Sequence, residues 1–181
     1  LIWIKPSVPF QLIYQNIDPE GRYVFLQGNL DGSPISILGL YAPNTGQTPF
    51  LHTLDRLLES SFGTPLVIGD FNCVYDVSLD RSHPPLPGAQ AHKAALDLNS
   101  WAQNWHIHDI WRMTHPQDCE FSYFSHVHAL HKRIDMFFNS IHLLQLTHWR
   151  VHTLPIVHYC SRFTGVRLTP KFLLGDCKYW H

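Results

Sequence analysis

A carboxylate and a carboxamide follow a short apolar run, in a position where reactive side chains are often found. The run Leu66-Val67-Ile68-Gly69 leads into Asp70 and, two residues on, into Asn72. If the extended backbone continues, both side chains point to the same side of the strand end. A carboxylate there can orient a water molecule, and a carboxamide can bind a phosphate oxygen. The alternative is an Asx turn with a purely structural role.

Two other segments place polar groups in similar positions. Tyr41 and Asn44 follow another apolar strand, in Tyr41-Ala42-Pro43-Asn44. Asp135 comes shortly after Arg133 and leads into the apolar residues Phe137-Phe138. A buried charge is costly unless it is paired. We therefore expect Asp135 either to pair with groups around Arg133 or to serve a site.

Apolar runs bounded by turn residues predict the strands that position these side chains, and amphipathic runs predict the helices. Strands are expected at residues 11–14, 22–30, 34–41, 66–69, 121–124, 133–138, 149–153 and 165–169, and helices at 49–61, 91–105 and near 141–146. Asp31-Gly32 between two β-rich runs predicts a hairpin. Strands in series with helices between them favour mixed sheets covered by helices, in the α/β or α+β class.

The composition is that of one globular domain. The chain has 181 residues, of which 45% are hydrophobic and 15% charged, and its formal net charge is −1. These values exclude a polybasic tail, an acidic tail and disorder caused by excess charge. No apolar run approaches the roughly 18–20 residues of a membrane span, so no membrane partner is expected.

Cysteine and histidine raise the questions of disulfides and zinc. The four cysteines lie far apart without a Cys-x-x-Cys pair, which favours a reducing, intracellular setting. Histidines at His106-x-His108 and His126-x-His128-x-x-His131 do not have the spacing of a standard zinc finger. We expect these histidines to be structural or incidental.

Six segments together resemble the endonuclease domain of LINE-type (non-LTR) retrotransposons, in the endonuclease/exonuclease/phosphatase superfamily that includes the apurinic/apyrimidinic endonucleases. The segments are Asp18-Pro19-Glu20-Gly21-Arg22-Tyr23, Leu40-Tyr41-Ala42-Pro43-Asn44, Ile68-Gly69-Asp70-Phe71-Asn72, Asp109-Ile110-Trp111-Arg112 with His115-Pro116, Phe121-Ser122-Tyr123-Phe124-Ser125 and Arg133-Ile134-Asp135. Their order and spacing fit the family from about Phe10 to about Thr169.

The resemblance implies a four-layer sandwich, in which two packed mixed β-sheets are flanked by helices. It would occupy residues 1–169, with 170–181 as a tail outside the core. The implied activity is Mg²⁺-dependent nicking of DNA, which leaves a 3′-hydroxyl from which a reverse transcriptase primes. DNA is then the expected partner, and a reverse transcriptase domain in the same polypeptide is a second candidate partner. The expected location is intracellular, and it is the nucleus if the domain is functional.

The resemblance also implies roles for single residues. Tyr41 would help to bind the scissile phosphate, Asp70 would orient or deprotonate the attacking water, and Asn72 would hold a phosphate oxygen. Asp135 matches the carboxylate that orients a catalytic histidine, whose imidazole stabilises the transition state. One Mg²⁺ would neutralise developing charge on the phosphate. Two further residues match positions that line the DNA-facing site: Asn44 and Ser122.

Two parts of the family pattern are missing. Family members begin with a strand that carries an Asn and continue to a metal-binding Glu, and this chain is expected to start downstream of both, which leaves the metal ligands unknown. The family closes with Trp-Ser-Asp-His-Ala-Pro-Val, but here Arg162 replaces the Asp and Phe163 replaces the His. A phenyl ring cannot transfer a proton or donate a hydrogen bond to phosphate. We therefore expect little or no nuclease activity.

Three alternatives remain open at this stage. The first is a non-catalytic nucleic-acid-binding remnant, although a near-zero net charge disfavours tight binding. The second is a phosphatase acting on inositol phosphates or lipids. The segments Tyr-Ala-Pro-Asn and Asp-Ile-Trp-Arg-x-x-His-Pro disfavour it, because they resemble the retroelement branch. The third is a chain that does not fold stably, because loss of the first strand exposes a sheet edge.

Overall fold

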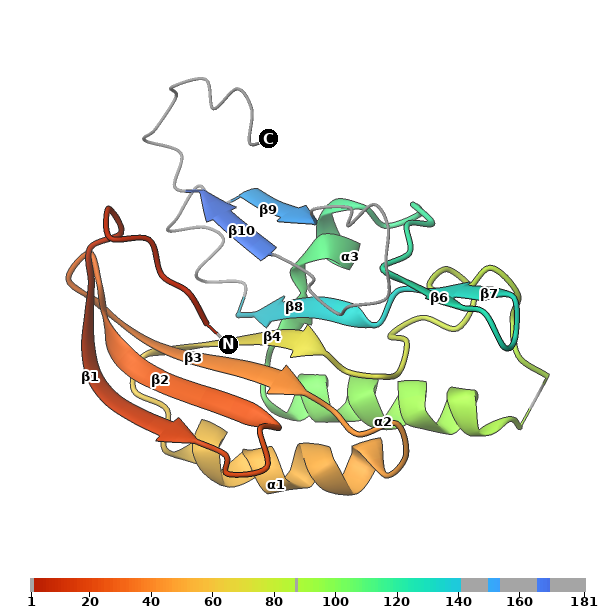
Figure 1. The fold of residues 1–181 in the computed structure, drawn as a ribbon, viewed down its shortest axis with the longest axis horizontal. Coiled ribbons are helices and arrows are strands. Elements are labelled where there is room, and N and C mark those ends of the chain that lie inside the picture. Colours follow the sequence, from red (N-terminus) through yellow and green to blue (C-terminus); the bar gives the residue numbers. More distant parts are fainter. Residues whose placement is uncertain (1, 87, 141–149, 154–165, 170–181) are drawn as a thin grey trace.

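The centre of the fold is a six-stranded mixed sheet (Figure 1). The structure, a computed structural model, describes residues 2–86, 88–140, 150–153 and 166–169. In order across the sheet, the strands are β1 (Phe10–Ile17), β2 (Tyr23–Leu30), β3 (Ser33–Tyr41), β4 (Thr64–Asp70), β8 (Asp135–Asn139) and β5 (His108–Asp109). Strands β3 and β4 run parallel, and the other neighbours run antiparallel.

The hairpin predicted at Asp31-Gly32 is confirmed. Leu30 pairs with Ser33, so only two residues form the loop between β2 and β3. Their φ angles are 51° for Asp31 and 78° for Gly32. Positive φ at both central positions is the signature of a type I′ turn, whose twist matches that of the flanking strands.

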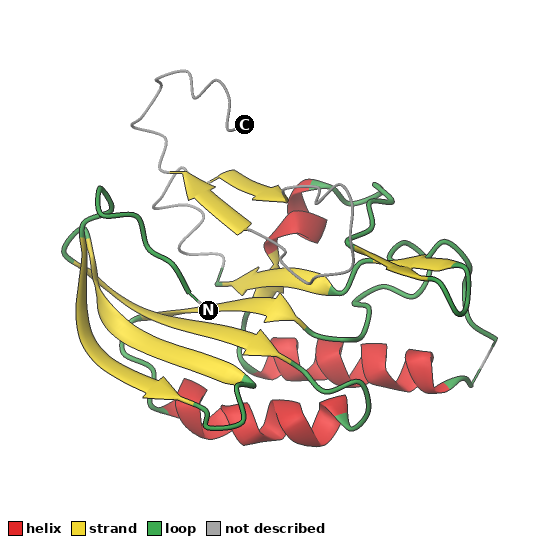
Figure 2. Cartoon of the chain, viewed as in Figure 1, coloured by secondary structure: helices red, strands yellow, loops and turns green. Residues whose placement is uncertain are grey.

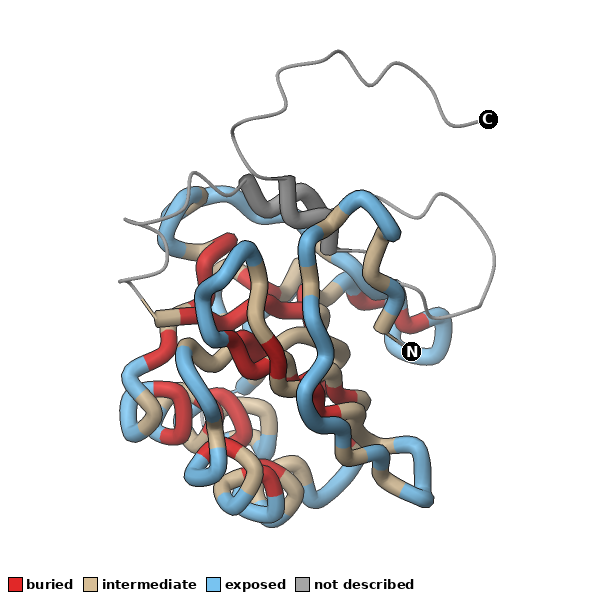
Figure 3. The backbone as a smooth tube through the Cα atoms, turned by 90° about the vertical axis from the view of Figure 1, so that its left-hand side faces the viewer, coloured by how far each residue is buried: buried red, intermediate tan, exposed pale blue. Residues whose placement is uncertain are grey.

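Two helices cover one face of this sheet (Figure 2). They are α1 (Gln47–Glu59) and α2 (Gln90–Asn104), close to the predicted ranges. Each turns an apolar stripe inward, because leucines and other apolar residues recur at three- and four-residue spacing. The resulting main core contains Phe25, Leu38, Leu40, Leu51, Leu54, Leu58, Val67, Leu98, Trp101 and Phe138. Figure 3 shows the buried backbone inside the molecule and the exposed segments around it.

A carboxylate joins the two helices. Asp55 on α1 accepts hydrogen bonds through Oδ1 from the indole nitrogens of Trp101 and Trp105, each at 2.9 Å. His52 Nδ1 lies 3.1 Å from its other oxygen. Burial raises the pKa of the Asp55 carboxyl, but the hydrogen bonds from Trp105, His52 and Trp101 outweigh this effect and hold the pKa below its ordinary value.

Removing this carboxylate is expected to destabilise the fold. Asp55→Ala leaves two indole N–H groups without their acceptor, so we expect a loss of about 2 kcal/mol in urea unfolding. Because the folded pKa of Asp55 is depressed, its contribution is present above the unfolded pKa and lost as pH falls through the folded pKa. The matched control is Glu59→Ala, which removes an exposed carboxylate from the same helix. Equal losses in the two variants contradict the assignment.

The opposite face of the large sheet carries a second apolar cluster. Its buried members include Ile35, Leu66 and Phe137, with Ile37 and Ile68 partly buried against them. The helix α3 (Ile110–Thr114) adds Ile110 to this cluster. Strands β9 (Arg150–Thr153) and β10 (Val166–Thr169) form a two-stranded antiparallel sheet on this side, away from α1 and α2 (Figure 1). The predicted mixed α/β architecture with a second sheet is confirmed.

Some boundaries differ from those that the sequence predicts. Strand β1 extends to Ile17, with a bulge between Leu12 and Tyr14, and β8 begins at Asp135, so that Arg133 precedes it. Short elements were not predicted, because two to five residues show no period: β5, α3 and β7 (Leu130–Lys132), which pairs with β6 (Tyr123–Ser125). The helix expected near 141–146 lies outside the described residues. No helix in the described part of the chain has the length and apolar character to cross a membrane.

Candidate active site

Three of the predicted site residues form a row across the ends of adjacent strands. Tyr41 at the end of β3 is in register with Asp70 at the end of β4, and Asp70 is in register with Asp135 at the start of β8. Neighbouring strands lie about 4.8 Å apart, and register partners project to the same face of a sheet. The fold thus brings Tyr41, Asp70 and Asp135 side by side, and we call these three residues the strand-end row.

The strand-end row faces the second sheet rather than the helices. Side chains alternate between faces along a strand, so Asp70 shares its face with Ile68, and Asp135 shares its face with Phe137. Both apolar residues belong to the second cluster, opposite α1 and α2. The row therefore lies at the polar edge of the sheet face that carries the second apolar cluster.

Backbone contacts fix the three strand ends against one another. Ala42 N donates to Asp70 O at 2.8 Å, and Phe71 N donates to Ile134 O at 2.8 Å. Gly69 allows β3 and β4 to approach closely, because a Cβ at this position would lie 1.9 Å from Leu40 O. The glycine backbone has φ of 149°, which side-chain-bearing residues rarely adopt. Close strand contact at Gly69 sets Tyr41 beside Asp70.

Asn72 reaches the site by a turn, so of the two conformations left open by the sequence the Asx turn is observed and the continued extended backbone is not. Its φ is 50°, and its N–H donates to Asp70 Oδ1 at 2.8 Å, as in an Asx turn. The chain turns because β4 ends at Asp70. Asn72 Nδ2 donates to Ala42 O at 2.6 Å, and within the described residues its second hydrogen meets no other acceptor. The structural turn thus orients both side chains of the predicted pair.

The remaining predicted residues lie at the same end of the sheet. Ser122 Oγ accepts hydrogen bonds from Ile134 N and Asp135 N, each at 3.2 Å, so it holds the start of β8. Asn44 and Asn72 line one cavity beside the row. The predicted degenerate positions Arg162 and Phe163 lie outside the described residues.

A cation also lies beside Tyr41. The guanidinium carbon of Arg22 lies 5.4 Å from the centre of the Tyr41 ring, within the range of a cation–π contact. Arg22 is positioned by its backbone, since Tyr41 N donates to Arg22 O at 2.8 Å and Arg22 N donates to Asp18 Oδ2 at 2.8 Å. This contact places positive charge at one end of the strand-end row.

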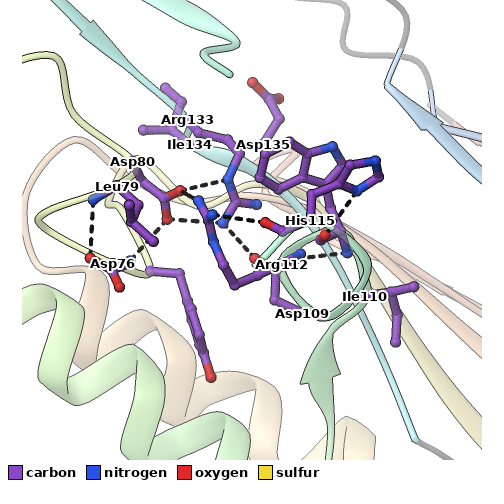
Figure 4. Close-up of polar contacts among 12 residues, drawn as sticks. Asp76, Leu79, Asp80, Asp109, Ile110, Arg112, His115, Arg133, Ile134 and Asp135 are labelled. Atoms are coloured by element: carbon purple, nitrogen blue, oxygen red, sulfur yellow. Dashed lines mark hydrogen bonds and ion pairs between the residues drawn. The ribbon is translucent and has the colours of Figure 1, made fainter. Parts of the chain in front are cut away.

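Sequence reasoning missed a buried ionic network behind the row (Figure 4). Arg133 is 2% exposed and donates through Nε to Asp80 Oδ1 at 2.8 Å and through Nη2 to Asp80 Oδ2 at 2.9 Å. The same Nη2 donates to Asp109 Oδ2 at 2.6 Å. Arg112 Nη2 also donates to Asp80, and both guanidinium carbons lie 4.8 Å from the Trp111 ring centre.

This buried network gives Arg133 two partners that the sequence did not identify. Its partners are Asp80, from a segment without any periodic signal, and Asp109, from the quoted motif Asp-Ile-Trp-Arg. Asp135 instead projects away from the network (Figure 4). Burial raises the pKa of Asp109, against the opposing effect of Arg133, while the charges of Asp109 and Asp80 outweigh burial and raise the pKa of Arg133. The network anchors the segment that immediately precedes Asp135.

The donor set of the row bears on magnesium binding. Among the described residues, no group of three or more His, Cys, Asp or Glu is placed to hold a metal ion. Asp70 and Asp135 supply two carboxylates in register. Mg²⁺ is commonly bound by one or two carboxylates together with waters and substrate phosphates. The described residues therefore fit a Mg²⁺ ion that is held jointly with a phosphate group.

Comparison with known proteins shows similarity of fold. No sequence model of a known protein family matches the chain. The catalytic domain of Xenopus laevis APE2 aligns with a TM-score of 0.63 and 18% identity, over 83% of this chain and 56% of that chain. The Neisseria 3′ phosphatase NExo, solved with a product DNA hairpin, aligns with a TM-score of 0.62 and 14% identity, over 93% of this chain and 72% of that one.

A retrotransposon protein is among the similar structures. The endonuclease domain of TRAS1, a telomere-specific non-LTR retrotransposon, aligns with a TM-score of 0.60 and 12% identity, over 91% of this chain and 70% of that one. The chain spans little more than half of the frog catalytic domain. It therefore has the fold of the apurinic/apyrimidinic-endonuclease-like proteins, and the resemblance predicted from the six motifs is confirmed at the level of fold.

Proposed function

We propose that this chain is a retrotransposon-type, Mg²⁺-dependent DNA endonuclease domain whose catalytic activity is impaired. The observation that carries the proposal is the strand-end row, in which Tyr41, Asp70 and Asp135 stand in register at one rim of the sheet. The fold neighbours support the substrate class, since they include the retrotransposon endonuclease domain and the 3′ phosphatase solved with a product DNA hairpin. A linked reverse transcriptase and action in the nucleus belong to the same proposal.

Each side chain has a role that its surroundings allow. Asp70 orients or deprotonates the attacking water, and its Oδ1 is fixed by the N–H of Asn72. The second Nδ2 hydrogen of Asn72 is suited to a phosphate oxygen, and the hydroxyl of Tyr41 contacts the same phosphate. When bound, Mg²⁺ would be held by Asp70 and Asp135 and would stabilise negative charge on the phosphate. Arg22 adds positive charge beside Tyr41.

The impairment follows from the two positions that depart from the family. Phe163 stands where the resemblance requires a histidine, and Arg162 stands where it requires an aspartate. A positioned proton-transfer group typically contributes about 10²–10⁴-fold to the rate. A guanidinium at Arg162 can still neutralise phosphate charge but does not replace proton transfer.

A plasmid-nicking assay with Mg²⁺ tests the proposed impairment. We expect the purified chain to nick supercoiled DNA no faster than its Asp70→Ala variant. EDTA-sensitive nicking that disappears in Asp70→Ala contradicts the impairment.

In the same samples, we expect duplex DNA to bind at low salt, and Tyr41→Ala to weaken that binding.

The matched control for binding is Tyr14→Ala on β1. Tyr14 is 49% exposed and lies on the edge strand, away from the strand-end row. Its loss should leave DNA affinity unchanged. If the chain binds no DNA at low salt, or if both tyrosine variants bind equally, the proposed DNA function is wrong.

A further inference from the structure

A cavity whose wall carries charged and amide side chains lies beside the strand-end row. It has a volume of about 270 Å³, and its lining includes Asn44, Gln47, Asn72, Arg81, Gln90 and Lys132. Asn72 belongs both to this cavity and to the turn that follows Asp70. The cavity therefore continues the candidate active site toward the helices.

The charged side chains in this cavity have one sign. Arg81 and Lys132 line it together, and none of the lining residues is acidic. Their backbones pair in an isolated antiparallel bridge, which holds the two cations side by side. Burial and the neighbouring charge of Arg81 lower the pKa of Lys132. Within the described part of the chain, neither cation forms a salt bridge with a carboxylate.

Both covering helices begin at this cavity, which adds to its positive potential. The lining includes Gly46 and Gln47 at the start of α1, and Gln90 and Ala91 at the start of α2. Neither helix has a side-chain N-cap hydrogen bond or an acidic residue in its first turn. The first N–H groups of a helix lack intrahelical acceptors and carry partial positive charge. Figure 1 shows both helices starting at the end where β3 and β4 finish.

The size of the cavity limits the ligand. Pockets for drug-sized molecules have volumes of roughly 300–1,000 Å³, so this cavity suits a smaller group. Two cations, uncapped helix N-termini and amide side chains together favour a phosphate ester rather than a neutral or cationic ligand. Because Asn72 lines this cavity and also donates its N–H to Asp70 Oδ1, the cavity adjoins the strand-end row.

We propose that this cavity is a second phosphate subsite, in which Arg81 and Lys132 together bind an internucleotide phosphate that neighbours the one at the strand-end row. The subsite rests on the proposed DNA function and deepens it, since it names a second point of contact with the strand. It concentrates positive charge on the DNA-facing rim of a chain whose formal net charge is −1. DNA binding then depends on local charge rather than on the net charge of the whole chain.

The test measures how DNA affinity depends on salt. Fluorescence anisotropy with a labelled duplex, over a series of KCl concentrations, compares the wild type with Arg81→Gln, Lys132→Gln and the double variant. One lost phosphate contact should reduce the salt slope of log K by about 0.9. Because Arg81 and Lys132 share that phosphate, the double variant should lose this full amount and each single variant only part of it. Arg81→Lys should retain most of the slope, which separates loss of charge from loss of folding. The matched control Arg56→Gln removes an exposed cation from α1 and should leave the slope unchanged.

A second probe separates failure of the subsite from failure of the DNA function. If the wild type binds duplex DNA and the cavity variants behave like Arg56→Gln, the subsite is overturned while the DNA function stands. Thymidine 3′,5′-bisphosphate, titrated by calorimetry, is expected to bind the wild type and to lose affinity in the double variant. If this mononucleotide binds but duplex DNA does not, both the DNA function and the internucleotide source of the phosphate are overturned.

Discussion

Replacing Arg133 by methionine is expected to destabilise the protein by about 3–5 kcal/mol, a large part of the roughly 5–15 kcal/mol that typically stabilises a domain. The substitution keeps an apolar stem of similar length but removes three hydrogen bonds to carboxylates. Asp80 and Asp109 are 0% and 2% exposed, so water cannot replace the lost guanidinium. Arg112 then remains as the cation beside two buried carboxylates, and the network carries an uncompensated charge.

Unfolding in guanidinium chloride, followed by circular dichroism, measures this loss. The matched control Arg56→Met removes an exposed arginine and should change stability by less than about 0.5 kcal/mol. Neutralising one carboxylate in the variant, with Asp109→Asn added to Arg133→Met, should restore part of the stability. A loss below about 1 kcal/mol in Arg133→Met contradicts the role assigned to the network.

The same variant should also respond to pH. Burial already raises the pKa of Asp109, and removal of Arg133 takes away the largest influence that opposes this rise. A carboxyl whose folded pKa lies above its unfolded value contributes stability below the unfolded pKa and loses it as pH rises through the folded pKa. The free energy of unfolding of Arg133→Met should therefore lie closer to that of the wild type at acidic pH than at neutral pH.

Sequence patterns predicted the parts of this fold that depend on local residues. Asp31-Gly32 specified its turn, because both positions need positive φ and few residues tolerate it. Apolar runs located the ends of β3 and β4, and so identified Tyr41 and Asp70 as strand-end residues. Their alignment in one row depends on the order of strands in the sheet, which no local pattern specifies.

Other parts of the site depend on contacts between distant segments. Asp80 and Arg133 are 53 residues apart, and Asp80 lies in a stretch that reads only as loop. Nothing in either segment alone identifies the other as its ionic partner. The cavity of Arg81 and Lys132 is likewise assembled from several loops and two helix starts. Asn72 was predicted as a site residue, but its positive φ was not, because the turn depends on how β4 ends beside Ala42.

Gly69 affects both the stability of the sheet and the geometry of the site. We expect Gly69→Ala to lower the free energy of unfolding by at least about 3 kcal/mol. The added Cβ would lie 1.9 Å from Leu40 O and 2.8 Å from Leu40 C, both of which are backbone atoms that cannot rotate aside. Relief requires β3 and β4 to separate at the residues immediately before Tyr41 and Asp70. The substitution therefore acts on the sheet and on the strand-end row together.

Gly21→Ala is the matched control, because it also has a positive φ but lacks the clash. The φ of Gly21 is 73°, and no atom lies within 4 Å of the position that an alanine Cβ would take. Alanine at this position should therefore lower the free energy of unfolding by only about 1–2 kcal/mol. Thermal unfolding compares the two variants, and hydrogen exchange locates the damage. We expect faster exchange at Tyr41 and Ala42, whose amides donate to Arg22 O and Asp70 O, in Gly69→Ala alone. Equal stability and equal exchange in both variants contradict the view that close contact at Gly69 holds Tyr41 beside Asp70.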